Sequence, residues 1–415
     1  MKIRRIILMS AITLGLSVNL AAAAADATCL FLLISPSPRA NGLGQTFLSL
    51  PETDAMIAFY NPASLGIFAL GNRVSLGFYP NRVSWLPGLT DELFYDCKAA
   101  NASFRLTRNL RAGIGYHRIY LDLGKIVGTD QSGQLIGPFR SWEKADAFSA
   151  GIGLDQRIKA GIGLTIKFIN NKLGESDVDG DRKSIGADGT AYDFGAMVQL
   201  PLLELWNMSS AIWRSENHKL YPFFSTTLAY TIKNIGDEIS YSEPSQADPL
   251  PRTARIGYSF DLGMTLRQRG MAWKLAAFTW AIEAEDLLIK QRRPPDYTIR
   301  YQIGLGDIHF FHDLFGGKNP SIVQMRGWEI NCLEVIYLQH GRYENPDGLI
   351  DYKTKGVGIG LAGWLKLMSQ FFPANRTIKF VTDHFDLQYQ WSEFIIAEDH
   401  PLAGTKFRGV NLIIR

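Results

Sequence analysis

Residues 158–170 read IKAGIGLTIKFIN, and this stretch decides the fold class. Large apolar residues such as Ile162 and Leu164 alternate with small or polar residues such as Thr165 and Lys167. Because successive side chains of a β-strand point to opposite faces, this period of two predicts a strand with one apolar and one polar face.

The same alternation recurs along the chain and predicts fourteen strands. Most of them are about 11–15 residues long, whereas strands of soluble sheets average ~5–6 and a tilted crossing of a bilayer needs ~9–11. The predicted spans are 72–79, 93–106, 111–123, 145–156, 158–170, 190–200, 223–235, 253–265, 275–287, 297–310, 328–340, 352–365, 379–393 and 406–415. Residues 271–289 have a helix-favouring composition, but their alternation favours a strand.

Composition excludes several classes of protein. The 415 residues are 46% hydrophobic and 20% charged, too apolar for a disordered chain and too polar for a bundle of membrane helices. The three cysteines are too few for a disulfide scaffold. Residues 1–25 hold three of the 43 basic residues and no acidic ones, which leaves 40 basic against 40 acidic residues and predicts no nucleic-acid partner.

Residues 1–25 have the pattern of a secretory signal peptide. Basic residues within the first five positions precede an apolar stretch over 6–20, and five alanines follow at 21–25. We therefore expect export of the chain across an inner membrane.

Export and an even number of long strands favour a membrane barrel over a soluble β-sandwich, which also alternates. In lipid every backbone N–H and C=O group must be paired within the protein, and a closed antiparallel sheet achieves this pairing. We expect an all-β fold, a transmembrane antiparallel barrel of about 14 strands. Its apolar face would meet outer-membrane lipid, so Ile162→Arg should disrupt assembly, whereas Thr165→Arg should be tolerated in the lumen.

The loops predict an orientation for this barrel. If the connection over 80–92 is external, the tight turns at 107–110 and 157 face the periplasm, as does the longer segment 201–222. The C-terminus then lies on the periplasmic side as well.

Residues 38–66, PRANGLGQTFLSLPETDAMIAFYNPASLG, carry a family resemblance. They closely resemble the N-terminal segment of FadL/TodX-like outer-membrane proteins, above all the PorV/PorQ branch. The resemblance spans most of the chain and implies a fourteen-stranded barrel over 72–415, with residues 26–71 folded inward as a plug. The plug residues that it marks are Arg39, Gly42, Gly44, Asp54, Asn61 and Pro62.

The types of these residues agree with a plug. Gly42 and Gly44 permit close approach of the backbone, and Asn61-Pro62 favours a turn. Arg39 could pair with charges of the lumen. A gating role and a purely structural hairpin both remain open for each residue.

Motifs for catalysis are weak, and the sequence predicts a protein that is not an enzyme and has no metal site or cofactor. No nucleophile elbow, phosphate-binding loop or metal-ligand spacing is complete. Glu283 and Glu285 share one strand face and could form an acidic patch in the lumen.

The resemblance implies two functions. A PorV/PorQ-type barrel would serve type IX secretion, with secretion-machinery proteins or exported cargo as partners at the cell surface. A FadL-like channel would take up fatty acids or other hydrophobic small molecules. An outer-membrane hydrolase is the third alternative.

Overall fold

The computed structural model describes most of the chain after the predicted signal peptide, which lies outside the described residues. The described ranges are 27–50, 54–68, 73–129, 135–178, 181–241, 247–268, 271–291, 299–317, 319–372 and 375–415. Within these ranges, no helix has both the length and the apolar character needed to cross a membrane.

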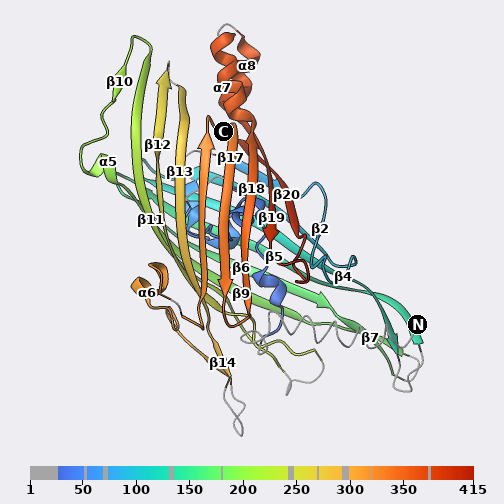
Figure 1. Cartoon of the computed structure of the whole chain (residues 1–415). Coiled ribbons are helices and arrows are strands. Elements are labelled where there is room, and N and C mark those ends of the chain that lie inside the picture. Colours follow the sequence, from blue (N-terminus) through green and yellow to red (C-terminus); the bar gives the residue numbers. More distant parts are fainter. Residues whose placement is uncertain are drawn as a thin grey trace.

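Fourteen antiparallel strands form a closed barrel (Figure 1). The first strand, β1, pairs with the last, β20, on one side and with β3 on the other, which closes the sheet. The barrel strands are β1 (Val74–Phe78), β3 (Phe94–Arg105), β4 (Leu110–Thr129), β5 (Leu135–Asp155), β6 (Lys159–Lys172), β9 (Asp188–Pro201), β11 (His218–Gly236), β12 (Thr253–Gln268), β13 (Met271–Leu287), β16 (Val323–Cys332), β17 (Ile336–Asn345), β18 (Ile350–Gly360), β19 (Phe385–Ile395) and β20 (Lys406–Ile414). The predicted fourteen-stranded barrel is confirmed.

The two faces of the barrel differ as the alternation predicts. On β6, Ile162 and Leu164 point outward with 57% and 62% of their surface exposed, whereas Thr165 and Lys167 point inward and are buried. An apolar outer face of this kind suits lipid rather than water. Aromatic side chains from four neighbouring strands form a row on this outer face: Phe224, Phe260, Trp280 and Trp328.

The connections distinguish the two ends of the barrel. We call one the loop end, because it carries β2 (Val83–Ser84), the hairpin of β7 (Gly174–Val178) and β8 (Asp181–Ile185), β14 (Ile289–Gln291), β15 (Ile299–Tyr301) and α6 (Phe310–Leu314). The other is the turn end. It carries α5 (Leu202–Leu205), β10 (Trp213–Arg214), α7 (Leu361–Phe371), α8 (Arg376–His384) and the C-terminus (Figure 1).

Two predicted strands are wrong, and their errors cancel in the count. The described part of 297–310 contains only β15 and the start of α6, because Gly304 and Gly306 adopt left-handed backbone with φ of 67° and 61°. The span 328–340 contains the ends of two strands, β16 and β17. They are joined by a tight turn in which Leu333 and Glu334 also have positive φ.

Two further predicted strands run into helices. The span 352–365 is β18 followed by the first turn of α7, and 379–393 is the end of α8 followed by β19. The reason is a change of period, because exposed apolar residues between 361 and 372 follow helical rather than alternating spacing.

Candidate functional site: the N-terminal segment in the lumen

Residues 27–68, which we call the N-terminal segment, lie against the inner face of the barrel (Figure 1). The segment starts near the loop end, where the N–H of Thr28 donates to Pro249 O at 2.9 Å. It leads into β1 at the turn end. It forms four short helices: η1 (Leu30–Leu33), α2 (Pro38–Gly42), α3 (Ile57–Tyr60) and α4 (Ser64–Phe68).

Nearly all described side chains of the segment are buried. Leu32, Phe47 and Ile57 are fully enclosed and belong to one cluster with barrel residues such as Tyr95 and Ile119. Burial raises the pKa of Tyr60, whose hydroxyl lies 2.6 Å from Ser35 Oγ and accepts from the N–H of Ser37 at 2.9 Å. The segment therefore packs as a protein core rather than as a loose tail.

Arg39 of α2 forms a buried, two-pronged ion pair with Glu329 of β16. Its Nε donates to Oε2 at 2.8 Å and its Nη2 to Oε1 at 2.5 Å. Gln339 of β17 donates to the same carboxylate at 2.9 Å, and the guanidinium lies 5.6 Å from the ring of Tyr337. Arg39 thus pairs with a charged residue of the inner wall.

Glu283 and Glu285 on β13 both face Arg255 of β12. Arg255 Nε donates to Glu283 at 2.7 Å, and its Nη1 lies 3.7 Å from Glu285. The other Glu283 oxygen accepts from the N–H of Leu48 at 2.8 Å, and Arg255 also donates to Gln45 O. Both carboxylates of the predicted acidic patch therefore lie beside a cation, and Glu283 contacts the N-terminal segment.

Gly42 and Gly44 lie against the backbone and side chains of β16, β17 and β18. At Gly44, where φ is 65°, a Cβ would lie 2.5 Å from Arg342 N and 2.8 Å from Arg326 O. At Gly42 it would lie 2.6 Å from Gln339 Oε1. Thr354 of β18 clamps this turn, since its hydroxyl accepts from Gly44 N at 2.9 Å and donates to Gly42 O at 2.8 Å.

Asp54 organises the start of α3. Its Oδ2 accepts from Ser37 Oγ at 2.7 Å, and its Oδ1 accepts from Met56 N at 2.7 Å. Asp54 therefore joins the second helix of the segment to the third. Residues 51–53 of the predicted plug lie outside the described residues.

Asn61 and Pro62 lie on an area of wall that we call the glycine shelf. It consists of four glycines that are in register on four neighbouring strands: Gly113, Gly151, Gly163 and Gly195. A Cβ at Gly163 would overlap the backbone of Pro62, and one at Gly195 would overlap Asn61 Oδ1. Asn61 also accepts from Ala63 N at 3.0 Å and donates to Ala196 O at 3.3 Å. The shelf therefore admits the segment by lacking side chains.

A lysine cluster in the lumen was not among the predicted site residues. Lys167 of β6 pairs with Asp193 of β9 at 2.9 Å and donates to Asn234 at 2.6 Å. Lys233 of β11 lies 3.9 Å from the centroid of the Phe59 ring, which belongs to the N-terminal segment. The only signal in the sequence is that these charged residues occupy the inward parity of their strands.

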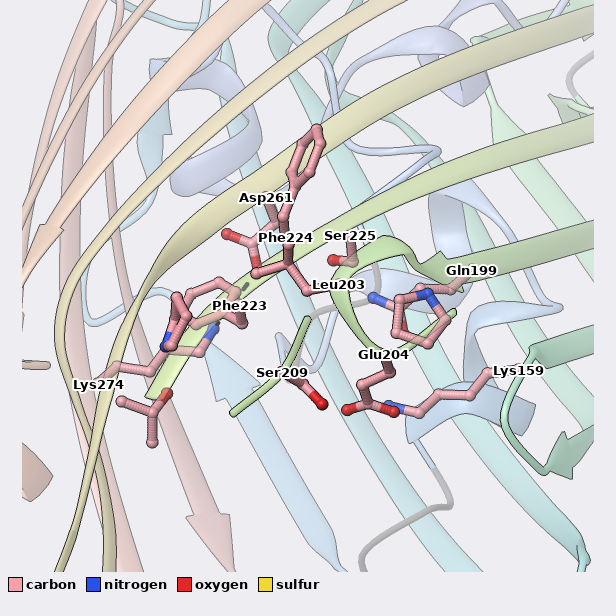
Figure 2. A pocket seen from close by; sticks show the side chains of 13 residues that line it. Lys159, Gln199, Leu203, Glu204, Ser209, Phe223, Phe224, Ser225, Asp261 and Lys274 are labelled. Carbon is pink, nitrogen blue, oxygen red and sulfur yellow. Dashed lines mark ion pairs between the residues drawn. The ribbon is translucent and has the colours of Figure 1, made fainter. Parts of the chain in front are cut away.

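A cavity of about 260 Å³ opens at the turn end (Figure 2). Strand residues and the α5 segment form its walls, and Lys159 and Glu204 point toward one another across it. Asp261 and Lys274 lie 3.7 Å apart on another wall, and Lys274 also lies 5.4 Å from the ring of Phe223. The lining is thus strongly charged.

The contacts that the site shows are ion pairs, hydrogen bonds and close backbone packing. Among the described residues, no three His, Cys, Asp or Glu side chains gather in a way that could hold a metal ion. The predicted plug residues and the acidic pair come together along one path through the lumen, where they hold the segment by ion pairs, hydrogen bonds and close backbone contact.

No family model and no curated protein matches the chain. Solved structures resemble it at low identity. The toluene transporter TodX of Pseudomonas putida is 11% identical with a TM-score of 0.38, over 92% of this chain and 97% of that one. A FadL homologue of Pseudomonas aeruginosa is 8% identical with a TM-score of 0.35, over 92% and 97%. The translocator domain of the autotransporter NalP from Neisseria meningitidis is 10% identical with a TM-score of 0.32, over 83% and 88%. The strands of this chain themselves form the barrel, because β1 pairs with both β20 and β3.

Proposed function

We propose that this chain is a non-enzymatic outer-membrane barrel whose lumen is closed by its N-terminal segment. We propose further that it handles exported proteins at the cell surface, as its resemblance to the PorV/PorQ branch implies. The signal peptide over 1–25 would deliver it, and its outward apolar face would meet the lipid.

The observation that carries this proposal is the buried ion pairing between the segment and the wall. A solute that crossed the lumen would have to displace the segment and separate Arg39 from Glu329. Breaking a buried ion pair leaves an uncompensated charge and costs about 3–5 kcal/mol. A barrel closed in this way has no continuous path through its lumen, so other molecules would contact its rims.

Uptake of hydrophobic small molecules is the second candidate, favoured by the cavity at the turn end. Its volume of about 260 Å³ lies just below the range of ~300–1,000 Å³ usual for small-molecule pockets. Its lining, however, includes the charged residues Lys159, Glu204, Asp261 and Lys274, which suits a hydrophobic ligand poorly.

Deletion of the gene in its native host separates the two candidates. We expect the deletion strain to lose exported proteins from its surface and medium, while it accumulates a labelled fatty acid at the wild-type rate. Complementation with the wild-type gene should restore export. Normal export together with slowed fatty-acid accumulation would contradict the proposal and favour uptake.

A further inference from the structure

The helical hairpin of α7 and α8 presents an apolar face away from the barrel. It connects β18 to β19 and stands at the turn end (Figure 1). The exposed apolar residues of α7 and the residue after it lie along one helical stripe: Leu361, Trp364, Met368, Phe371 and Phe372. Trp364 is 50% exposed and Phe371 is 70% exposed.

The opposite face of α7 is fixed to the barrel. Lys366 is 5% exposed and forms an ion pair with Glu334 in the turn between β16 and β17. Gly363 lies so close to this turn that a Cβ would overlap Leu333 O. The helix therefore buries a lysine and a glycine and exposes tryptophan and phenylalanine, the reverse of a helix that faces water.

The apolar stripe continues the outer face of the barrel. On β18 the outward residues nearest the helix are Val357 and Ile359, at 39% and 52% exposure, and Leu361 follows them at the same parity. On β19 the outward residues Leu387 and Tyr389 flank the hairpin. Whatever covers the outer face of these strands is therefore in position to cover α7.

Charge on α8 complements the stripe. Arg376 and Lys379 are exposed on α8, where they could meet anionic headgroups. Tryptophan and phenylalanine favour the boundary between headgroups and acyl chains, and amphipathic helices with basic polar faces bind there.

We propose that α7 and α8 form an anchor in the phospholipid interface, with the α7 stripe inserted among the acyl chains and Arg376 and Lys379 at the phosphates. The proposal rests on the placement of the barrel in a membrane and is independent of a role in export. The proposed lipid contact lies at the turn end. There, within the described ranges, the outward apolar residues of β18 continue into α7.

Depth-dependent quenching tests this proposal on the full chain. The background is Cys332→Ser, because Cys332 is the exposed thiol and Cys29 and Cys97 are buried. An environment-sensitive fluorophore is attached at Met368→Cys or Phe371→Cys on the stripe, or at Asp383→Cys on α8 as the matched control. Ile162→Cys on the barrel belt reports correct insertion, and circular dichroism confirms the strands.

In nanodiscs of phosphatidylethanolamine and phosphatidylglycerol, we expect acyl-chain nitroxides to quench the labels at 368 and 371 about twofold or more above the label at 383. Iodide should show the opposite order. Reversal of Arg376 and Lys379 to Glu should reduce the lipid quenching at 371 in these nanodiscs, but not in phosphatidylcholine.

If iodide quenched the labels at 371 and 383 equally, while acyl-chain nitroxides still quenched the label at 162, the anchor proposal would be wrong. The barrel itself would still lie in the membrane. Protection of 368 and 371 from both quenchers would also overturn the anchor proposal. Such protection would assign the stripe to a second copy if it varied with protein concentration, and to a contact within the chain if it did not.

Discussion

The N-terminal segment meets two walls of the barrel by two different means. On the glycine shelf of β4, β5, β6 and β9, contact depends on the absence of side chains, so that Asn61-Pro62 lies on bare backbone. On β12, β13 and β16, contact depends on charge. The Arg39–Glu329 pair joins the segment to β16, and the Arg255–Glu283 pair of the wall hydrogen-bonds the segment's backbone at Gln45 and Leu48. Close packing on the glycine shelf and charge on β12, β13 and β16 together define one position for the segment.

The two means differ in how they fail. A steric contact tolerates no added atom but is indifferent to pH and salt, because close packing is short-ranged. A buried ion pair depends on both charges and is strongly destabilised when either partner is lost. The following predictions separate the two walls.

The largest effect is expected at the shelf, from Gly163→Val. The new side chain would occupy the place of the Pro62 backbone, which also lies against Gly151 on the neighbouring strand. We expect displacement of the segment and a several-fold rise in ion conductance across planar bilayers. The neighbouring Leu164→Val on the lipid face is the matched control, and equal conductance of both variants would show that the shelf does not seat the segment.

The charged wall is tested by Glu329→Ala. It leaves Arg39 buried without its carboxylate, so we expect a loss of about 3–5 kcal/mol in the free energy of unfolding, measured by urea titration in lipid vesicles. Glu344→Ala is the control, because its partner Arg342 is 45% exposed and such pairs contribute about 0–1 kcal/mol. Similar losses for both variants would count against a stabilising role of the buried pair.

The outer face provides a reference for both walls. Ile162→Arg places a charge in the lipid belt and should cost about 2–4 kcal/mol of folding free energy near the midplane. We expect its assembly into vesicles to fail while Gly163→Val still assembles. If both variants assembled equally well, Ile162 would not face lipid.

Asn61→Ala should have a smaller effect. It removes one acceptor for Ala63 N and one donor to Ala196 O, and we expect a loss of about 1–2 kcal/mol in vesicle unfolding. Asn61→Asp keeps the acceptor and should recover part of this loss. A larger loss with Asp than with Ala would contradict this expectation and would show that a buried carboxylate beside Ala196 O costs more than the retained acceptor contributes.

The smallest perturbation is thiol labelling of the native chain. Burial and, to a smaller extent, the nearby Glu143 raise the pKa of Cys29 to about 12, so the thiol stays protonated at neutral and mildly alkaline pH. We expect maleimide to modify Cys332 and to leave Cys29 unmodified at pH 8. In Gly163→Val, faster labelling of Cys29 would show that loss of the shelf releases the whole segment.

Alternation predicted the outer face well because successive side chains of a strand point to opposite faces of the sheet. Even 271–287, with a helix-favouring composition, is strand β13, since tertiary pairing outweighs propensity. The turn at Leu333-Glu334 was missed because it lacks the glycine or asparagine that usually adopts positive φ. The resulting error was hidden by the false strand at 297–310.

The inner face was harder to predict because its partner is distant in the sequence. No residue near Gly163 predicts its contact with Pro62, and the sequence Gly-Ile-Gly at 161–163 is equally compatible with an empty lumen. We no longer expect Thr165→Arg to be tolerated, because that expectation assumed open space in the lumen at this position. Thr165 is 3% exposed and hydrogen-bonds Ser149 at 2.8 Å in a packed interior, not a watery one.

Hydrogen–deuterium exchange of the full chain in phospholipid vesicles tests the central claim most directly. If ion pairs and the glycine shelf seat the N-terminal segment, amides of α2 and α3 should exchange as slowly as those of β6 and β16. Exchange of residues 38–60 within seconds, beside protected strands, would show an unseated segment and contradict the account.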